Sequence, residues 1–412
     1  MNRIRFSVWN VSLILTAVCM AITAACGDNS EGDTPLKIGL LMNFSSGSAE
    51  VYRDRQRAFD LAIKHINEGG GVFGLPVQTV VGDTTADPEV AVEEARRMVE
   101  TERVHAIVGP NASANALPIA ERVTGPGGIP TVGFSATSPM LTTVVDNDYL
   151  FRTVLSDRAQ GPILARVTRE RGFDNVGVIY VDDAWGQGLS STFEAAWEGQ
   201  LKSVPVERGQ TTFVSELRES ASEGAQALVV MVFETEAGII VKEALDNKIY
   251  DQFTFGDAAK RLSIVKLAGG SRLEGMYGTG PTTAPSSSSS AAWEASYIDE
   301  YGELPVLTYV KETYDATVVL ALAAQAAGKV EGAAIRDQLR AVGGAPGAIV
   351  IAGAEGISRA LSILQDKGEV DYQGAATTLD WDENGDLRRG YVGVWRYTRD
   401  ERIEELDATL FE

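Results

Sequence analysis

Three hydroxyl side chains lie directly after predicted strands, where they could hold the anionic group of a small ligand. Ser113 follows the apolar run Val104–Val108 and begins a helical pattern, where unpaired N–H groups and a positive helix end favour an anion. Ser135 and Thr137 follow the run Ile129–Gly133. Ligands bind at this carboxyl edge of the strands in open α/β sheets, so we expect the three side chains to line a binding site. The alternative is that Ser113 and Thr137 only cap helices.

The sequence lacks the motifs of the common enzyme classes. It contains no phosphate-binding loop, no complete Gly-x-Gly-x-x-Gly after a strand and no Gly-x-Ser-x-Gly nucleophile elbow. His65 and His105 are its only histidines, and neither has the spacing of a metal ligand. We therefore expect a binding protein without metal or cofactor rather than an enzyme. An exported glycosidase that uses carboxylates alone is the enzymatic alternative.

The chain is acidic, with 57 Asp and Glu against 36 Lys and Arg and a net charge of −21. Such a charge repels phosphate backbones, so no nucleic-acid partner is expected. It also argues against binding to anionic lipid through a basic face. The length of 412 residues suggests two or three domains, at about 150 residues each.

The N-terminus has the organisation of an export signal. Arg3 and Arg5 precede an apolar stretch from Val11 to Ile22, which is too short for a membrane span and is followed by small residues. Residues 1–25 are therefore predicted to be a signal peptide that is removed from the mature protein.

Cys26 follows two alanines and resembles the cysteine of a bacterial lipobox, which is acylated and becomes the first residue of the mature chain. Ordinary cleavage after Ala25, which would leave a free thiol, is the alternative. Cys19 is the only other cysteine and lies in the signal, so no disulfide can form within the mature chain. Residues 26–35 lack large apolar side chains and are predicted to tether the protein to its lipid anchor. We therefore expect a location in the cell envelope, outside the cytoplasmic membrane.

Short apolar strands alternate with single helical patterns, and the series restarts after residue 153. The predicted strands are Leu36–Met42, Val77–Val81, Val104–Val108, Ile129–Gly133, Val176–Val181, Ala227–Val232 and Phe253–Phe255. Strands separated by single helices form a parallel sheet that is covered on both faces. The sequence therefore predicts an α/β protein with two doubly wound, Rossmann-like units.

The last third of the chain gives weaker signals. Pro281–Ser290 contains five consecutive serines and is predicted to be a solvated surface loop. Two helices are expected at Ala292–Tyr301 and Thr313–Ala327, and a strand near Tyr391–Tyr397.

A set of short motifs runs in order from residue 36 almost to the end of the chain. It includes Ala58-Phe59-Asp60-Leu61-Ala62-Ile63, Gly69-Gly70-Gly71, Ile107-Val108-Gly109-Pro110, Ser135-Ala136-Thr137-Ser138-Pro139, Tyr314-Asp315-Ala316 and Trp381-Asp382. Together the motifs resemble the type I periplasmic solute-binding proteins, specifically the branched-chain amino-acid (Leu/Ile/Val) binding family of ABC-type importers.

The resemblance implies a clamshell of two lobes joined by three crossover segments, with a small ligand trapped in the cleft when the lobes close. The crossings are expected near Thr153, near Gly278–Pro281 and near Arg389–Tyr391. Lobe 1 would then comprise residues 36–153 and 280–388, and lobe 2 residues 154–279 and 389–412.

The resemblance also implies which residues touch the ligand. The residues carried over are Ser113, Ser135, Ala136, Thr137, Trp185, Phe233 and Asp257. The lobe 1 positions would hold the α-carboxylate and ammonium of an amino acid, Trp185 and Phe233 would cover it, and Asp257 would pair with the ammonium. A buried cation needs such a carboxylate partner.

Two of these residues depart from the family pattern. Phe233 lacks the hydroxyl of the tyrosine that is common there, and Asp257 is one methylene shorter than the frequent glutamate. The alternatives are that Trp185 is a packing residue and that Asp257 caps the helix predicted at Lys260–Leu267.

The resemblance implies a lipid-anchored solute-binding protein that delivers a small amino acid, of the branched-chain type, to the permease subunits of an ABC importer. A first alternative is the same fold with an amide, urea, aromatic or short carboxylic acid as ligand. A second is a ligand sensor. We expect transport because no kinase or receptor domain is fused within these 412 residues.

Overall fold

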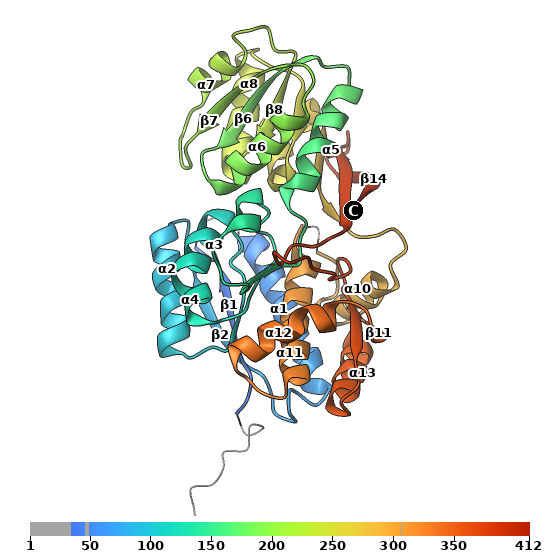
Figure 1. The fold of residues 1–412 in the computed structure, drawn as a ribbon. Coiled ribbons are helices and arrows are strands. Elements are labelled where there is room, and N and C mark those ends of the chain that lie inside the picture. Colours follow the sequence, from blue (N-terminus) through green and yellow to red (C-terminus); the bar gives the residue numbers. More distant parts are fainter. Residues whose placement is uncertain (1–33, 46–48, 306) are drawn as a thin grey trace, which may run out of the picture.

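The computed structural model describes residues 34–45, 49–305 and 307–412 (Figure 1). The predicted signal peptide and Cys26 lie outside the described residues. The chain forms two α/β lobes stacked end to end, and each is built around its own sheet.

Lobe 1 is built around a five-stranded parallel sheet with the order β2-β1-β3-β4-β5. Its strands are β1 (Lys37–Met42), β2 (Gln78–Asp83), β3 (Ala106–Val108), β4 (Thr131–Gly133) and β5 (Leu150–Arg152). Its helices include α1 (Ala49–Glu68), α2 (Pro88–Arg96), α3 (Ser113–Ile119), α10 (Ser288–Tyr301), α11 (Val310–Ala327), α12 (Gly332–Gly343) and α13 (Ala354–Gln365). A two-stranded parallel ribbon, β11 (Ala348–Ile351) with β12 (Val370–Gln373), completes the lobe.

The two faces of this sheet bury alternate residues of the same strands. In β1, Leu40 belongs to the core shared with α1 and α11, whereas Leu41 belongs to the core shared with α2 and the helical segment after α3. Side chains on a strand point alternately to opposite faces, so helices on both sides demand a continuous apolar run such as Gly-Leu-Leu-Met.

Lobe 2 is built around a seven-stranded sheet with the order β14-β13-β10-β9-β8-β6-β7. The parallel strands are β6 (Asn175–Val181), β7 (Gln200–Val206), β8 (Ala227–Met231), β9 (Phe253–Phe255) and β10 (Tyr277–Thr282). The C-terminal strands β13 (Gly390–Tyr397) and β14 (Ile403–Phe411) add an antiparallel edge. The helices are α5 (Asp157–Glu170), α6 (Ala184–Ala196), α7 (Val214–Ser220), α8 (Glu234–Asp246) and α9 (Leu262–Ala268).

The chain passes between the two sheets three times. It leaves the first sheet after β5 and enters α5, returns after β10 into α10, and crosses again before β13. The two doubly wound lobes with three crossovers confirm the fold class predicted from the sequence.

The serine run was predicted wrongly. Instead of a solvated loop, its second half begins α10, because the Ser287 side chain caps the helix by accepting a hydrogen bond from the Ser290 N–H. Ser289 is buried, and its hydroxyl donates to the Gln373 carbonyl at 2.6 Å and accepts from the Ala352 N–H at 2.9 Å. Serine is a favoured N-cap residue. A run of serines can therefore contain the start of a helix, which its low complexity does not indicate.

His65, one of the two histidines, lies on α1 and is buried, with its Nδ1 2.7 Å from the Tyr314 hydroxyl. One further local prediction, the start of the helix expected at Thr313, differs from the structure. The helix α11 starts at Val310 and is buried over nearly all its length, so it lacks the polar face that marks helix boundaries in a sequence. No single helix among the described residues has the length and apolar composition to cross a membrane; α11 and α12 meet these criteria only as a pair bent by 110°.

Candidate ligand-binding site between the lobes

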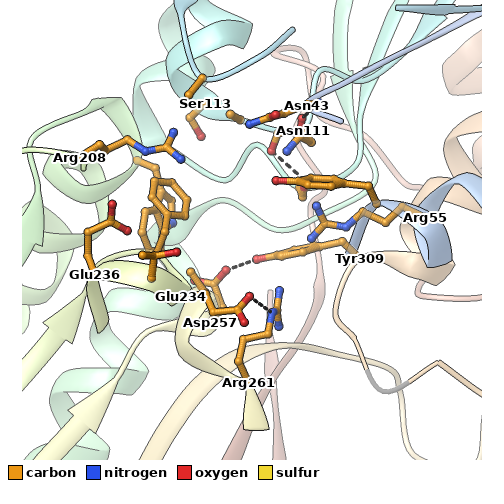
Figure 2. A pocket seen from close by; sticks show the side chains of 18 of the residues that line it. Asn43, Arg55, Asn111, Ser113, Arg208, Glu234, Glu236, Asp257, Arg261 and Tyr309 are labelled. Carbon is orange, nitrogen blue, oxygen red and sulfur yellow. Dashed lines mark hydrogen bonds and ion pairs between the residues drawn. The ribbon is translucent and has the colours of Figure 1, made fainter. Parts of the chain in front are cut away.

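A cavity of about 490 Å³ lies between the two lobes (Figure 2). This volume is in the range of small-molecule sites, roughly 300–1,000 Å³. Lobe 1 contributes Asn43, Tyr52, Arg55, Ala86, Asn111, Ala112, Ser113, Ser135 and Tyr309 to its wall. Lobe 2 contributes Trp185, Arg208, Gly209, Phe233, Glu234, Thr235, Glu236, Asp257, Ala258 and Arg261.

The loop after β3 brings Asn111 and Ser113 to the cavity. The loop turns sharply at Gly109, which has a φ of +112°. A Cβ atom at this position would lie 2.0 Å from the Leu41 carbonyl oxygen, so no side chain can be accommodated. Ser113 is the first residue of α3 and is not its cap, because Ala112 occupies that position. The Ser113 hydroxyl oxygen accepts a hydrogen bond from the Ser138 N–H at 3.1 Å, so its own hydrogen is available to a ligand acceptor.

Ser135 has the opposite hydrogen-bonding role. Its hydroxyl donates to the Asn111 carbonyl at 2.8 Å, which leaves the oxygen free to accept from a ligand N–H. Together, Ser113 and Ser135 therefore offer one donor and one acceptor on the same wall of the cavity.

Arg152 holds the loop that carries Ser135. Its guanidinium donates to the carbonyls of Ala136 (3.3 Å) and Ser138 (2.9 Å), and Nε donates to Asp386 Oδ1 at 2.7 Å. This buried ion pair ties the loop to the segment that precedes the third crossover. Sequence patterns do not indicate this role, because Arg152 and Asp386 are separated by 234 residues.

Ala136 and Thr137 are absent from the cavity wall. Ala136 is fully buried in a small apolar cluster with Ala116 and Leu141. Thr137 is also buried, and its hydroxyl donates to Asp157 Oδ2 at 2.9 Å. Thr137 does not cap a helix either, since the following 3₁₀ turn is capped by Ser138.

Two aromatic rings from lobe 2, which contact each other at a tilt, line one side of the cavity. The ring centroids of Trp185 and Phe233 lie 4.8 Å apart with an interplanar angle of 33°. The N-cap Asp183 fixes Trp185 in the first turn of α6 by accepting hydrogen bonds from the N–H groups of Trp185 and Gly186. The Cζ atom of Arg208 lies 4.5 Å from the Phe233 centroid, a cation–π contact.

Asp257 is buried at the floor of the cavity and is held from both lobes. Its Oδ1 accepts from Gln160 Nε2 at 3.1 Å, and its Oδ2 accepts from the Tyr309 hydroxyl. Burial raises the pKa of Asp257, and these two hydrogen bonds oppose the rise. Asp257 does not cap α9, whose N-cap is Arg261.

Tyr309 was missed by the sequence interpretation. It is the N-cap of α11 and has a φ of +70°, a left-handed conformation that is rare for an aromatic residue. Non-glycine residues in this region occur at sites where the surrounding structure imposes them. The conformation places the Tyr309 ring in the cavity wall and its hydroxyl on Asp257 (Figure 2).

The lobes also touch directly beside the cavity. The Ser138 hydroxyl of lobe 1 donates to the Ala184 carbonyl of lobe 2 at 2.6 Å. One turn further along α6, a Cβ on Gly188 would lie 2.6 Å from Pro139 Cδ and 2.7 Å from Ser138 Oγ. The backbone of α6 therefore rests against the Ser138–Pro139 turn without any side chain in between.

Charged side chains in the cavity come from both lobes. Lobe 1 contributes Arg55, and lobe 2 contributes Arg208, Arg261, Glu234, Glu236 and Asp257. Within the described ranges, no group of three or more His, Cys, Asp or Glu is placed to hold a metal ion. The wall can therefore bind a small polar ligand by hydrogen bonds, charge and aromatic contact.

Sequence comparison gives matches over most of the chain. The family model described as periplasmic binding protein matches residues 35–360. The substrate-binding protein BasB of a chemotactic signal transduction system in Halobacterium salinarum is 25% identical over 355 residues, which cover 84% of this chain and 83% of the relative. A leucine-, isoleucine-, valine-, threonine- and alanine-binding protein of Pseudomonas aeruginosa is 27% identical over 331 residues, covering 78% and 86%.

Solved structures show the same fold. The leucine-binding protein LivK of Thermotoga maritima has a TM-score of 0.76 at 23% identity, covering 90% of this chain and 98% of LivK. LivJ of Streptococcus pneumoniae, solved with isoleucine, has a TM-score of 0.73 at 22% identity, covering 92% and 99%. The two-lobed architecture is thus the same in all three proteins.

Proposed function

Because the chain belongs to the periplasmic binding protein family, we propose that it captures a small amino acid between its lobes and delivers it to the permease of an ABC importer. Members of this family are extracytoplasmic solute-binding proteins and not enzymes. Beyond family membership, we propose the class of ligand that the protein binds and its delivery to a permease.

The buried carboxylate of Asp257 is the observation that carries the proposal. It lies in the wall of the inter-lobe cavity and can pair with a ligand ammonium, which would remove part of the cost of its burial. Ser113 supplies a hydroxyl donor for a ligand carboxylate and Ser135 an acceptor for the ammonium. An α-amino acid presents both groups on one carbon, which fits this set of partners.

Branched-chain amino acids are the first ligands to test, because the Pseudomonas aeruginosa relative is named for binding them. The BasB relative belongs to a chemotactic signalling system, which supports the alternative that this protein reports ligand to a sensor. An amide, urea or carboxylic acid ligand would leave Asp257 without a cation to pair with.

The proposal includes export and anchoring. Cleavage before Cys26 and its acylation would leave residues 26–35 as a tether on lobe 1. The proposed lobe boundaries are 36–153 with 280–388, and 154–279 with 389–412. Cys26 lies outside the described residues, so this part depends on the sequence alone.

Calorimetry with wild type and Asp257→Asn tests the ligand class. The ligands are leucine, isoleucine, valine and alanine, together with their deaminated acids and their amides. The wild type is expected to prefer amino acids to the deaminated acids. Asp257→Asn should erase this preference, since removing one side of a buried charged pair costs about 2–5 kcal/mol, or roughly 30- to several-thousand-fold in Kd. Equal binding of every amino acid by both proteins would refute the ammonium role of Asp257.

A further inference from the structure

The cavity contains a buried cation, Arg55, that forms no ion pair among the described residues, although the buried carboxylate of Glu312 in α11 acts on it electrostatically and opposes the lowering of its pKa by burial. Arg55 projects from α1 into the cavity wall and is only 5% exposed. Its Cζ atom lies 5.8 Å from the ring centroid of Phe134 and 5.3 Å from that of Tyr309. Its Nε has no hydrogen-bond partner among the described residues. A buried guanidinium in this state is costly unless a ligand supplies the missing acceptor.

A second guanidinium lies across the cleft. Arg261 of lobe 2 lines the same cavity and is also buried. Burial, and then the like charge of Arg261, lower the pKa of Arg55 to about 10, so Arg55 remains charged at neutral pH. Arg261 has Glu234 nearby, at 3.9 Å between Nε and Oε2, whereas none of the ion pairs among the described residues includes Arg55.

The carboxylates of the cavity are held by other groups. Asp257 accepts from Tyr309 and Gln160. Glu236 accepts from the Gly209 N–H at 3.0 Å, and Glu234 accepts from the Ser263 hydroxyl. The three acids that line the cavity belong to lobe 2 and have other hydrogen-bond partners, and none of them forms an ion pair with Arg55.

The apolar part of the wall does not fit a branched aliphatic side chain closely. Its apolar members are alanines and the aromatic residues Trp185, Phe233, Tyr52 and Tyr309, and the described residues of the wall include no Leu, Ile, Val or Met. Beside Arg55, the lobe 1 wall is polar, with Asn43 and Asn111 (Figure 2).

From this geometry we infer that the ligand is an amino acid with an acidic side chain, whose second carboxylate pairs with Arg55. This inference rests on the proposed amino-acid function and names the side chain that the function leaves open. A planar guanidinium can hold a carboxylate through two parallel hydrogen bonds. The second carboxylate would also lie in the field of Arg261 and so reduce the repulsion between the two guanidiniums.

Calorimetry against glutamate, aspartate, glutamine, leucine and glutarate tests the inference. The wild type should bind glutamate or aspartate at least about 30-fold more tightly than glutamine or leucine, the size expected for a desolvated charged pair. Glutarate carries both carboxylates but no ammonium, so weak binding of glutarate separates the contribution of Asp257 from that of Arg55.

Arg55→Met keeps the length of the side chain and removes its charge. It should lower the affinity for the acidic amino acids roughly 30-fold or more and leave that for glutamine within about threefold. Without ligand, its free energy of unfolding should equal or exceed that of wild type, because an unpaired buried charge is lost. Arg55→Lys, which keeps the charge, should retain part of the preference. Arg53→Met, on the same helix with a side chain 53% exposed, is the matched control and should change nothing.

The two proposals fail in different ways. If wild type and Arg55→Met both bind leucine more tightly than glutamate, the inference that the ligand has an acidic side chain is refuted. The proposal that the protein binds an amino acid is then unaffected. Binding of none of the amino acids by the wild type would overturn both. The order of affinities of the wild type for these ligands tests the inference about the acidic side chain even where a variant fails to fold.

Discussion

The hydroxyl of Tyr309 in lobe 1 donates a hydrogen bond to the carboxylate of Asp257 in lobe 2. The proposed ammonium partner is therefore also a point of attachment between the lobes. Ligand capture and lobe closure then share one carboxylate, so a change at Tyr309 should affect binding even though a phenylalanine there would keep the ring in the cavity wall.

Tyr309→Phe should weaken ligand binding by roughly 10- to 150-fold. Hydrogen bonds to charged groups contribute about 1.5–3 kcal/mol, and this one forms only when the lobes meet, so its loss lowers the stability of the closed state. Calorimetry with the best ligand measures the change. Tyr301→Phe is the control, because the Tyr301 hydroxyl donates to the Arg57 carbonyl within lobe 1. An equal loss in both variants would contradict a role in closure.

Gly188→Ala should hold the lobes apart. The new methyl group would overlap Pro139 and Ser138 of the other lobe, and such overpacking costs about 1–3 kcal/mol, or roughly 5- to 150-fold in Kd. Small-angle scattering should show a smaller radius of gyration with ligand than without for wild type, and a reduced difference for the variant.

A control variant separates this effect from simple helix damage. A Cβ on Gly127 of lobe 1 would meet its neighbours at 3.7 Å, an ordinary contact distance. Gly127→Ala should therefore bind and close as wild type does. Normal closure of Gly188→Ala at saturating ligand would show that α6 and the Ser138–Pro139 turn do not meet in the closed protein.

Glu312→Gln should stabilise the protein at high pH and have no effect at low pH. Burial in α11 raises the pKa of Glu312 from 4.5 to about 7. The folded protein then binds this proton more tightly than the unfolded chain, so the free energy of unfolding falls as the pH rises from about 4.5 to about 7. The gain from the substitution should reach at most about 3 kcal/mol at pH 8 and vanish near pH 4.

Urea denaturation at several pH values measures this difference. Glu303→Gln, at an exposed position, is the control and should show no such pH dependence. A constant difference between wild type and Glu312→Gln from pH 4 to pH 8 would show that Glu312 titrates normally in the folded protein.

Cys26→Ser should release the protein from membranes into the soluble envelope fraction or the medium. The sequence after residue 26 has no apolar run long enough to span a bilayer, so acylation would be the attachment. Fractionation of cells that express wild type or Cys26→Ser tests this. An unchanged membrane fraction would exclude the lipid anchor.

The sequence was sufficient to predict the alternation of strands and helices and the parts of the site that follow strands. The rule that ligands bind at the carboxyl ends of strands predicted Ser113, Ser135 and Thr137. Ser113 and Ser135 lie in the cavity wall, whereas Thr137 does not. Trp185, Phe233 and Asp257, which were expected from the family resemblance, also lie in the wall.

The remaining wall residues could not be found in this way. Arg55 lies within a helix, and a charged residue in a helical pattern usually indicates a solvent-exposed face. In the folded protein, Phe134 and Tyr309 pack around its guanidinium, which is buried. Tyr309 depends on the position of α11, an almost wholly buried helix whose start the periodicity of the sequence does not define.

Strand β14 was also not predicted. Its apolar and polar residues do not alternate regularly, and it carries several acidic residues, as exposed edge strands do.

The contact of Gly188 with Pro139 has a mechanical consequence. A glycine at position 188 leaves no room for a side chain between α6 and the Pro139 ring. We therefore expect this contact to limit how far the two lobes can approach each other, so that ligands of different size should leave the lobes at a similar angle.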